Sequence, residues 1–226
     1  MSESIAEKKC RRITDELAEK NVLHKEKVTY AGHKGVLLYK LKTIGVALYT
    51  ARYGKQPVRA EMDRILAEHS SLEHGYSIKE ICQIMRRSKY FEKLHMWDLR
   101  SKFALDNGDG TFYIPDIVGK REGRMYYYEY ETGNMANAGE LNEKLNKMLR
   151  QTRDFNFILP NTTLTFRYQK EFYKWAQKNK SNPEVSRITF RMTVYENLKR
   201  QIVIGAPYDN WWAQTWNAMS IPEPQL

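Results

Sequence analysis

The sequence predicts an α/β protein built on a mixed sheet that is flanked by helices. Residues 155–160 form a predominantly apolar run, which suits a strand buried at the centre of a sheet. Segments with helical periodicity, 136–152 and 166–179, lie on either side of this run. Two strand-like segments, 111–118 and 124–132, come directly before them. Consecutive strands followed by a helix–strand–helix order indicate a mixed sheet covered by helices.

Composition and charge place the chain among folded proteins with a basic surface. Its 226 residues are 42% hydrophobic and 12% aromatic, which is enough for a sizeable core. Lys and Arg (37) outnumber Asp and Glu (27), for a formal net charge of +10. Such a charge favours polyanions through counterion release, with an anionic membrane surface as the competing partner. Because no apolar run approaches ~18 residues and the amino terminus lacks the apolar core of a signal peptide, we expect a cytoplasmic protein without a membrane partner.

Motifs that would indicate several other chemistries are missing from the sequence. It contains neither a P-loop nor a nucleophile-elbow motif, which disfavours an ATPase and a serine hydrolase. The five histidines show no metal-ligand spacing, and His69 and His74 are too far apart for one helix face. Cys10 and Cys82 are distant from each other and fit neither a metal site nor a cytosolic disulfide. We therefore interpret both cysteines as small buried apolar residues.

The amino-terminal part of the chain predicts a helix, a hairpin and a second helix. The first helix covers residues 4–22. Strands at 28–30 and 36–41 flank a glycine-bearing turn at 32–35. Thr43 is placed to cap the second helix. Basic residues gather at the start of the first helix and on the hairpin: Lys8, Lys9, Arg11, Arg12, Lys34 and Lys42.

This basic helix and hairpin resemble the second half of a winged helix-turn-helix domain. The run Leu41-Lys-Thr-Ile-Gly45 also resembles the end of the wing in bacterial proteins of this kind. The resemblance implies a helix in the DNA major groove and a hairpin tip on the flanking backbone, with the six basic residues as DNA contacts. A complete domain has two further helices before the recognition helix, and the sequence has no room for them. The chain is then a fragment, the domain is incomplete, or residues 4–50 are simply a helix and hairpin packed onto the rest.

A glycine and a proline close together after the second helix indicate a linker. We therefore expect a winged-helix-like segment at residues 1–56 and a second domain at residues 57–226. The second domain begins with two predicted helices, 60–70 and 77–87, separated by a break at 73–75.

Further strands and turns follow these two helices. A strand at 93–105 precedes a strong turn at 106–110, which resembles a calcium loop but lacks the later glutamate. Residues 186–194 predict the last strand, and Tyr195 starts a short helix. Near the carboxyl terminus, three tryptophans form either an edge cover packed on the sheet or a tail that binds a partner. They are Trp211, Trp212 and Trp216.

Three carboxylates lie on two neighbouring strand segments that are otherwise apolar or aromatic. Asp116 belongs to the first segment, while Glu129 and Glu131 alternate with tyrosines on the second and therefore share a face. Buried negative charge is costly unless a cation neutralises it, and a divalent metal is the usual solution. One or two carboxylates suit Mg²⁺, which polarises a phosphate and lowers the pKa of a water. In the alternative, Glu129 and Glu131 face solvent and the tyrosines pack inward.

The same residues resemble the signature of the PD-(D/E)XK nuclease superfamily. Pro115-Asp116, a gap, and Glu129-Tyr-Glu131 follow its order, and the resemblance spans about residues 65–200. It implies a fold of a helix, a three-strand meander, a helix and a strand. It also implies that Asp116 and Glu129 are the metal ligands.

The signature usually has a lysine where this chain has Glu131. Some members place the missing cation on the following helix, so Lys144 is the candidate substitute and Lys147 the second. An acidic residue on the first helix often completes the pattern. Glu73 and Glu80 both remain open for that position.

Within the superfamily, the chain is most similar to the replication-relaxation family of mobile-element proteins. That family joins a winged helix to a degenerate nuclease-like domain, and Glu129-Tyr-Glu131-Thr-Gly133 followed by Lys144-Leu145 parallels its motif. The resemblance implies a DNA-binding protein of a plasmid, conjugative element or phage. It would act in DNA replication, relaxation or transfer, with other replication or transfer proteins as partners.

Two hypotheses about function follow. In the first, the second domain is a Mg²⁺-dependent endodeoxyribonuclease, active or degenerate, with catalytic residues Asp116, Glu129, Glu131 and Lys144. In the second, the same fold is a non-catalytic scaffold or transcriptional regulator that binds DNA or a protein.

Overall fold

The chain forms two compact units, Met1–Glu73 and His74–Leu226, in the computed structural model. The structure describes residues 5–30, 33–54, 72–96, 104–133 and 138–223. The expected domain boundary at residue 56 and the expected helix at 60–70 lie outside these residues. Within them, no helix combines the length and apolar character needed to cross a membrane.

Within the described residues, the first unit contains a helix, a hairpin and a second helix, namely α1 (Ile5–Glu19), β1 (Leu23–Tyr30), β2 (His33–Leu41) and α2 (Thr43–Tyr53). Cys10 of α1 is exposed, so its expected burial is wrong. The strands are antiparallel, and their register pairs Leu23 with Leu41 and Tyr30 with His33. The expected turn at 32–35 is therefore wrong, because His33 already belongs to β2. Long strands paired almost to their ends leave only two residues for the turn.

The start of α2 is held by close packing rather than by a side-chain cap. Thr43 is the first helical residue and Lys42 occupies the cap position without a side-chain hydrogen bond, so the expected Thr43 cap is wrong. Gly45 is buried in the first turn, where a Cβ atom would lie 2.4 Å from the carbonyl oxygen of Val22. Only glycine allows the helix to come this close to the preceding chain.

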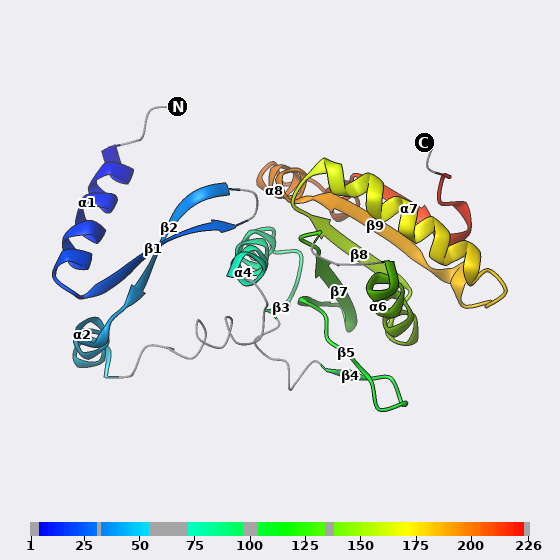
Figure 1. Ribbon diagram of the computed structural model, residues 1–226, viewed down its shortest axis with the longest axis horizontal. Helices are drawn as coiled ribbons and strands as arrows, with labels where there is room; N and C mark the ends of the chain where they lie inside the picture. Colours follow the sequence, from blue (N-terminus) through cyan, green and yellow to red (C-terminus); the bar gives the residue numbers. More distant parts are fainter. Residues whose placement is uncertain (1–4, 31–32, 55–71, 97–103, 134–137, 224–226) are drawn as a thin grey trace. The chain divides into compact units, whose positions relative to one another are not determined.

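The second unit is an α/β domain with a six-stranded mixed sheet in the order β10-β9-β8-β7-β6-β3 (Figure 1). Three antiparallel strands, β3, β6 and β7, are followed by β8 and β9, which run parallel to β7, and by the antiparallel edge strand β10. The prediction of a mixed sheet flanked by helices is confirmed. The strands are β3 (Lys93–Met96), β6 (Ile117–Arg121), β7 (Arg124–Tyr130), β8 (Asp154–Leu159), β9 (Thr189–Val194) and β10 (Gln214–Asn217).

In the described part of this unit, the sheet is accompanied by four helices, a two-stranded hairpin and three short 3-10 turns. The helices are α4 (Leu72–Arg87), α6 (Ala138–Gln151), α7 (Thr162–Lys178) and α8 (Tyr195–Val203). The hairpin strands are β4 (Leu105–Asp106) and β5 (Phe112–Tyr113), and the 3-10 turns are η2 (Val185–Arg187), η3 (Tyr208–Trp211) and η4 (Ala218–Ser220).

Three expected elements differ from the structure, each for a physical reason. Helix α4 begins at Leu72 and runs through the expected break at 73–75, because tertiary packing outweighs the low helix propensity of one buried glycine. The strand expected at 93–105 is β3, which ends at Met96, and residues 97–103 are outside the description. The strand expected at 111–118 is divided into β5 and β6, since Pro115 cannot donate a ladder hydrogen bond.

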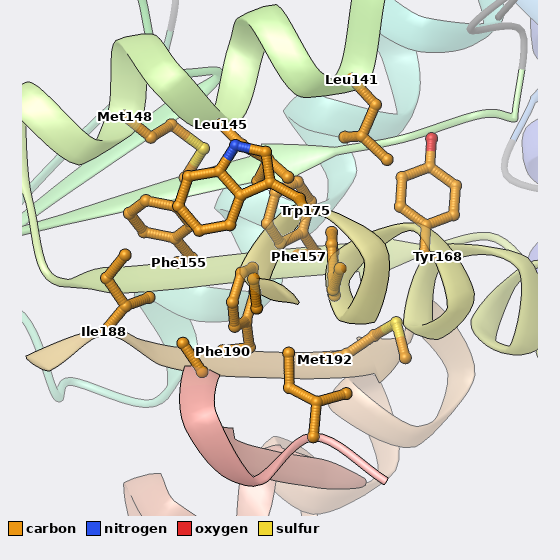
Figure 2. Close-up of a cluster of buried hydrophobic side chains, with 14 of the residues drawn as sticks. Leu141, Leu145, Met148, Phe155, Phe157, Tyr168, Trp175, Ile188, Phe190 and Met192 are labelled. Carbon is orange, nitrogen blue, oxygen red and sulfur yellow. The ribbon is translucent and has the colours of Figure 1, made fainter. Parts of the chain in front are cut away.

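The main core lies between the sheet and helices α6 and α7 (Figure 2). Phe155 and Phe157 of β8 are fully buried, as is Phe190 of β9. Each such side chain stabilises the fold by about 1.5–3 kcal/mol through burial. Trp175 of α7 crosses this core, and its Nε1–H donates to Asn146 Oδ1 of α6 at 2.9 Å. The two helices therefore pack on the same face of the sheet, and β8 is buried as the apolar run at 155–160 predicts.

The opposite face of the sheet is covered by aromatic residues from the carboxyl-terminal part of the chain. The Tyr128 hydroxyl lies 2.9 Å from that of Tyr208, and the rings of Tyr128 and Trp212 are stacked. Trp211 and Trp212 are buried, and β10 pairs with β9. Of the two expectations for the tryptophan-rich segment, the cover packed on the sheet edge is confirmed.

Candidate active site: a buried carboxylate–lysine cluster

Three carboxylates are buried at one end of the β6–β7 pair. Ile117 pairs with Tyr128, so Asp116, one residue before it, lies beside Glu129, one residue after Tyr128. The exposed fractions are 7% for Asp116, 1% for Glu129 and 5% for Glu131. The alternative in which both glutamates face solvent is therefore wrong. Alternation along β7 turns Glu129 towards α6, and Tyr128 towards the other face.

Lys144 of α6 joins the two glutamates. Its Nζ donates to Glu129 Oε2 at 2.7 Å and also bonds Glu131 Oε1. Burial alone would lower the pKa of Lys144, but the adjacent carboxylates outweigh burial and hold that pKa well above its usual value. Lys144 is therefore a permanent ammonium in the cluster. Its position follows from the apolar stripe of α6, which packs Leu141 and Leu145 on the sheet and leaves Lys144 at the margin of that stripe.

Two tyrosines hold the remaining glutamate oxygens. The hydroxyl of Tyr113, from β5, donates to Glu129 Oε1 at 2.9 Å. The hydroxyl of Tyr168, from α7, donates to Glu131 Oε2 at 3.0 Å. Burial, followed by the neighbouring carboxylate charge, raises the pKa of each tyrosine. Both phenols therefore remain neutral donors, and all four glutamate oxygens have a partner.

Asp116 is held at its other side by α4 and by the backbone of β7. Its Oδ2 accepts from the Tyr130 backbone N–H at 2.9 Å, and His74 Nε2 lies 3.4 Å away. The same His74 nitrogen is 2.8 Å from the Tyr130 carbonyl oxygen, to which it donates. Burial lowers the pKa of His74, but the Asp116 charge and both hydrogen bonds raise it to about 9. Burial likewise opposes ionisation of Asp116, yet the His74 and Lys144 charges keep its pKa below the usual value.

Glu129 behaves differently from Asp116. Burial, with the charges of Asp116 and Glu131, raises its pKa to about 7 against the opposing effect of Lys144. Asp116 is therefore ionised at neutral pH, whereas Glu129 is poised to gain or lose a proton. Two carboxyl groups with separated pKa values in one site can divide the acid and base roles of a reaction.

A pocket of about 260 Å³ opens beside Lys144. Phe112 and Tyr113 of β5 form one wall, and α6 forms the other. Lys147 and Glu143 line the α6 wall as an ion pair with 2.7 Å between Nζ and Oε1. The second lysine candidate thus lies at the pocket and is neutralised on its own helix. Lys144 has a 27% exposed side chain, so it reaches both the carboxylates and the pocket.

The donor chemistry of the site fits Mg²⁺. Asp116 and Glu129 are hard oxygen ligands on neighbouring strands, and magnesium needs only one or two carboxylates besides water. Glu129 would exchange its bond to Lys144 for a bond to the ion. Within the described part of the chain, no three His, Cys, Asp or Glu residues are arranged as a metal site, so a magnesium site here would consist of two protein ligands and waters.

Sequence reasoning missed His74, Tyr113 and Tyr168. The break predicted at 73–75 places His74 outside a helix, whereas it lies in the first turn of α4. Tyr113 is three residues before Asp116, so a polar aromatic residue near the motif was the available signal. Tyr168 is brought in by the docking of α7, and no local pattern indicates it.

Of the two candidates for the acidic residue on the first helix, Glu73 stays a prediction. The side chain of Glu73 lies outside the description. Glu80 is six residues after His74 on α4, which places it about 240° around the helix from the histidine that contacts Asp116.

The basic residues expected to contact DNA lie in the first unit. Lys8, Lys9, Arg11 and Arg12 are exposed on α1, and Arg12 Nε is 3.6 Å from Glu16 Oε1. Lys42 Nζ donates to Asn21 Oδ1 at 2.9 Å. Lys34 lies in β2, and its side chain is outside the description.

Comparisons of the chain with protein-family models, with curated proteins and with solved structures found no match. The functional argument therefore rests on the residues of the cluster and their geometry.

Proposed function

We propose that the chain is a DNA-binding protein with a Mg²⁺-dependent nuclease site of the PD-(D/E)XK kind, acting in the replication, relaxation or transfer of a plasmid, conjugative element or phage. The observation that carries the proposal is the meeting of Lys144 with Glu129 beside Asp116. A lysine from α6 thereby supplies the cation that the motif usually has at position 131.

The order of elements supports this proposal. A helix, the antiparallel strands β3, β6 and β7, the helix α6 and the parallel strand β8 follow one another as the resemblance implies. Asp116 precedes the middle strand, and Glu129 lies near the end of the third. This arrangement supports Asp116 and Glu129 as the metal ligands of the proposed site.

The motif glycine also has a structural reason in this chain. Gly133 has a φ of 84°, and a Cβ atom there would lie 2.8 Å from Leu164 Cδ2. Only glycine allows both the left-handed backbone and the close approach. The run from Glu129 to Gly133 is thus one local structure, which supports kinship with the replication-relaxation family.

Each residue of the cluster has a role in the proposed reaction. Asp116 and Glu129 would hold the ion, which when bound polarises the phosphodiester and lowers the pKa of an attacking water. Lys144 stabilises the negative charge that develops on the phosphate. Glu131, itself held by Tyr168, keeps the Lys144 ammonium in position. His74 keeps Asp116 ionised.

Nicking of supercoiled plasmid with Mg²⁺ or Mn²⁺ tests the proposal. We expect nicking by the wild type, and a loss of about 10²-fold or more in Glu129→Gln and in Lys144→Met. Asp209→Asn is the matched control, because Asp209 is an exposed acid of η3 that does not line the pocket beside Lys144. Nicking that is absent from the wild type, or equal in all variants, contradicts a nuclease site.

A second function is favoured by one observation: all four oxygens of Glu129 and Glu131 are already bonded by Lys144, Tyr113 and Tyr168. Such a closed network suits a non-catalytic DNA-binding scaffold. In that case the wild type binds DNA in a salt-dependent manner without nicking it. DNA affinity that is the same at low and high salt contradicts both functions, because phosphate contacts release counterions.

A further inference from the structure

Two lysines face each other across the outer strands of the sheet. Lys93 of β3 is directly opposite Lys120 of β6 in the antiparallel register, so both side chains lie on one face. Like charges in this arrangement destabilise a sheet. Neither lysine forms one of the ion pairs found among the described residues, although Lys93 is exposed and Lys120 is half-buried. The stability of the sheet does not explain this pair.

A second like-charge pair lies one residue further along β6 and therefore on the opposite face of the sheet, because side chains alternate along a strand. Arg121 is opposite Arg124 at the end of the β6–β7 hairpin. The Arg121 guanidinium carbon is 4.1 Å from the centroid of the Tyr90 ring, and that of Arg124 is 5.2 Å from the Tyr126 ring. Cation–π contacts of this kind hold the guanidinium groups in place.

The aromatic rings beneath these arginines are not open to bases. The Arg121 guanidinium lies over one face of the Tyr90 ring. The Tyr90 ring is also stacked on the Tyr208 ring, with ring centroids 4.5 Å apart and 9° between the ring planes. Tyr126 packs edge-on against Tyr90 and Tyr208. Stacking of nucleobases on aromatic side chains needs a free ring face. These rings therefore position charge and do not recognise bases.

The nearby carboxylates neutralise the arginines but not the lysines. Glu122 is 3.1 Å from Arg121 Nε, and Asp154 pairs with Arg124. The side chain of Glu92 accepts from the backbone N–H of Glu122 at 2.7 Å. Further exposed cations lie at the end of α4 and just after it: Arg87 and Lys89. Lys93 and Lys120 are therefore the cations at this corner of the sheet that no carboxylate neutralises in an ion pair among the described residues.

The corner is aligned with the carboxylate–lysine cluster. Lys120 is opposite Met125 in the β6–β7 register, and Glu129 is four residues after Met125 on β7, so the Lys120 and Glu129 side chains lie on the same face of the sheet. The separation along the chain is about 13 Å at ~3.3 Å per residue. A polyanion lying on this face can thus extend from Lys120 to the proposed metal ligands.

We propose that this corner, through Lys93 and Lys120, binds the sugar–phosphate backbone of DNA without reading its sequence and guides it to the cluster. The inference rests on the proposed function and adds the surface through which the second unit contacts its substrate. Charge without free ring faces or base-reading side chains gives positioning and no sequence preference.

Fluorescence anisotropy with two unrelated labelled duplexes, in EDTA to prevent cleavage, tests the surface. Lys93→Gln/Lys120→Gln should bind both duplexes at least about 10-fold more weakly than wild type, with a salt slope smaller by about 2. The matched control is Lys178→Gln/Lys180→Gln, which removes the same charge from two exposed lysines at the end of α7. The control should bind within about 2-fold of wild type, since surface substitutions elsewhere remove only a distant charge.

Each alternative outcome overturns a different statement. If wild type binds DNA but both double variants bind equally well, the surface is wrong and the proposed function stands. If wild type does not bind DNA, the proposed function fails as well. Lysine-dependent binding to anionic phospholipid vesicles without binding to DNA overturns the choice of occupant. Thermal unfolding checks the fold, and the Lys93→Gln/Lys120→Gln midpoint should equal or exceed the wild-type midpoint because repulsion is removed.

Discussion

Lys144 of α6 and Glu129 of β7 form a buried ion pair with 2.7 Å between Nζ and Oε2. The pair connects a helix to the sheet strand that precedes it in the chain, with Glu131 as the second carboxylate on the same ammonium. The Glu129 side chain is only 2% exposed, so its charge has little access to water. The balance of charge in the cluster therefore depends on Lys144.

Removal of Lys144 should destabilise the second unit strongly. In Lys144→Met, two buried glutamates lose their counter-charge, and we expect the free energy of unfolding to fall by about 3–5 kcal/mol. Urea unfolding at neutral pH measures the change. Lys147→Met, which removes the next lysine on α6 and its surface pair, should change stability by less than about 1 kcal/mol. Equal effects in the two variants would show that Lys144 is not the neutralising charge.

Below pH 7, the dependence of the free energy of unfolding on pH should reveal the protonation of Glu129. Its pKa in the folded chain is about 7 against an ordinary value of 4.5, so between these values the native state binds more protons than the unfolded state. The free energy of unfolding should therefore fall as the pH rises from 4.5 to about 7, by at most ~1.4 kcal/mol per pH unit for one proton, and this contribution should be level above pH 7. Urea unfolding in EDTA measures the slope. Glu129→Gln should remove it, and an unchanged slope in that variant would assign the proton elsewhere.

Above pH 6.5, the dependence of the free energy of unfolding on pH should reveal the deprotonation of His74. Its pKa is raised from 6.5 to about 9 by Asp116, so the stability it contributes is complete below pH 6.5 and is lost as the pH rises through about 9. His74→Gln should flatten the profile in this window and leave the Glu129 window in place. Titration of the imidazole by NMR gives the pKa directly. A value near 6.5 would contradict an ion pair between His74 and Asp116.

The two glycines Gly133 and Gly123 should differ in their tolerance of alanine. Both have left-handed backbone, with φ of 84° and 77°, but only at Gly133 would a Cβ atom meet a neighbour, Leu164. Gly123→Ala should cost about 1–2 kcal/mol from backbone strain alone. Gly133→Ala should cost about 1–3 kcal/mol more because Leu164 must move.

A double-mutant cycle tests the cause of that difference. Gly133→Ala combined with Leu164→Ala should show a coupling energy of about 0.5–3 kcal/mol by urea unfolding. Additive losses would show that the overlap with Leu164 is not responsible.

Much of the second unit follows from local patterns in the sequence. The segments 136–152 and 155–160 correspond to α6 and β8 within a few residues. Helix α7 begins four residues before the expected start at 166, because Asn161 caps it by accepting from the Leu164 backbone N–H at 3.2 Å. That cap signal is present in the sequence and was overlooked. Boundaries set by a single capping residue are easier to miss than the periodicity of a whole helix.

The candidate site, like the fold, is only partly predictable from local patterns in the sequence. The sequence by itself determined that Glu129 and Glu131 share a face, because side chains alternate along any strand, and that Lys144 lies beside an apolar stripe. Only the tertiary structure decided that this face is buried, that Tyr113 and Tyr168 complete the glutamate hydrogen bonds, and that His74 pairs with Asp116. The physical reason is that periodicity is a local property of the backbone. Contacts between β5, α7, α4 and the strands depend on how whole elements pack, which residue spacing does not encode.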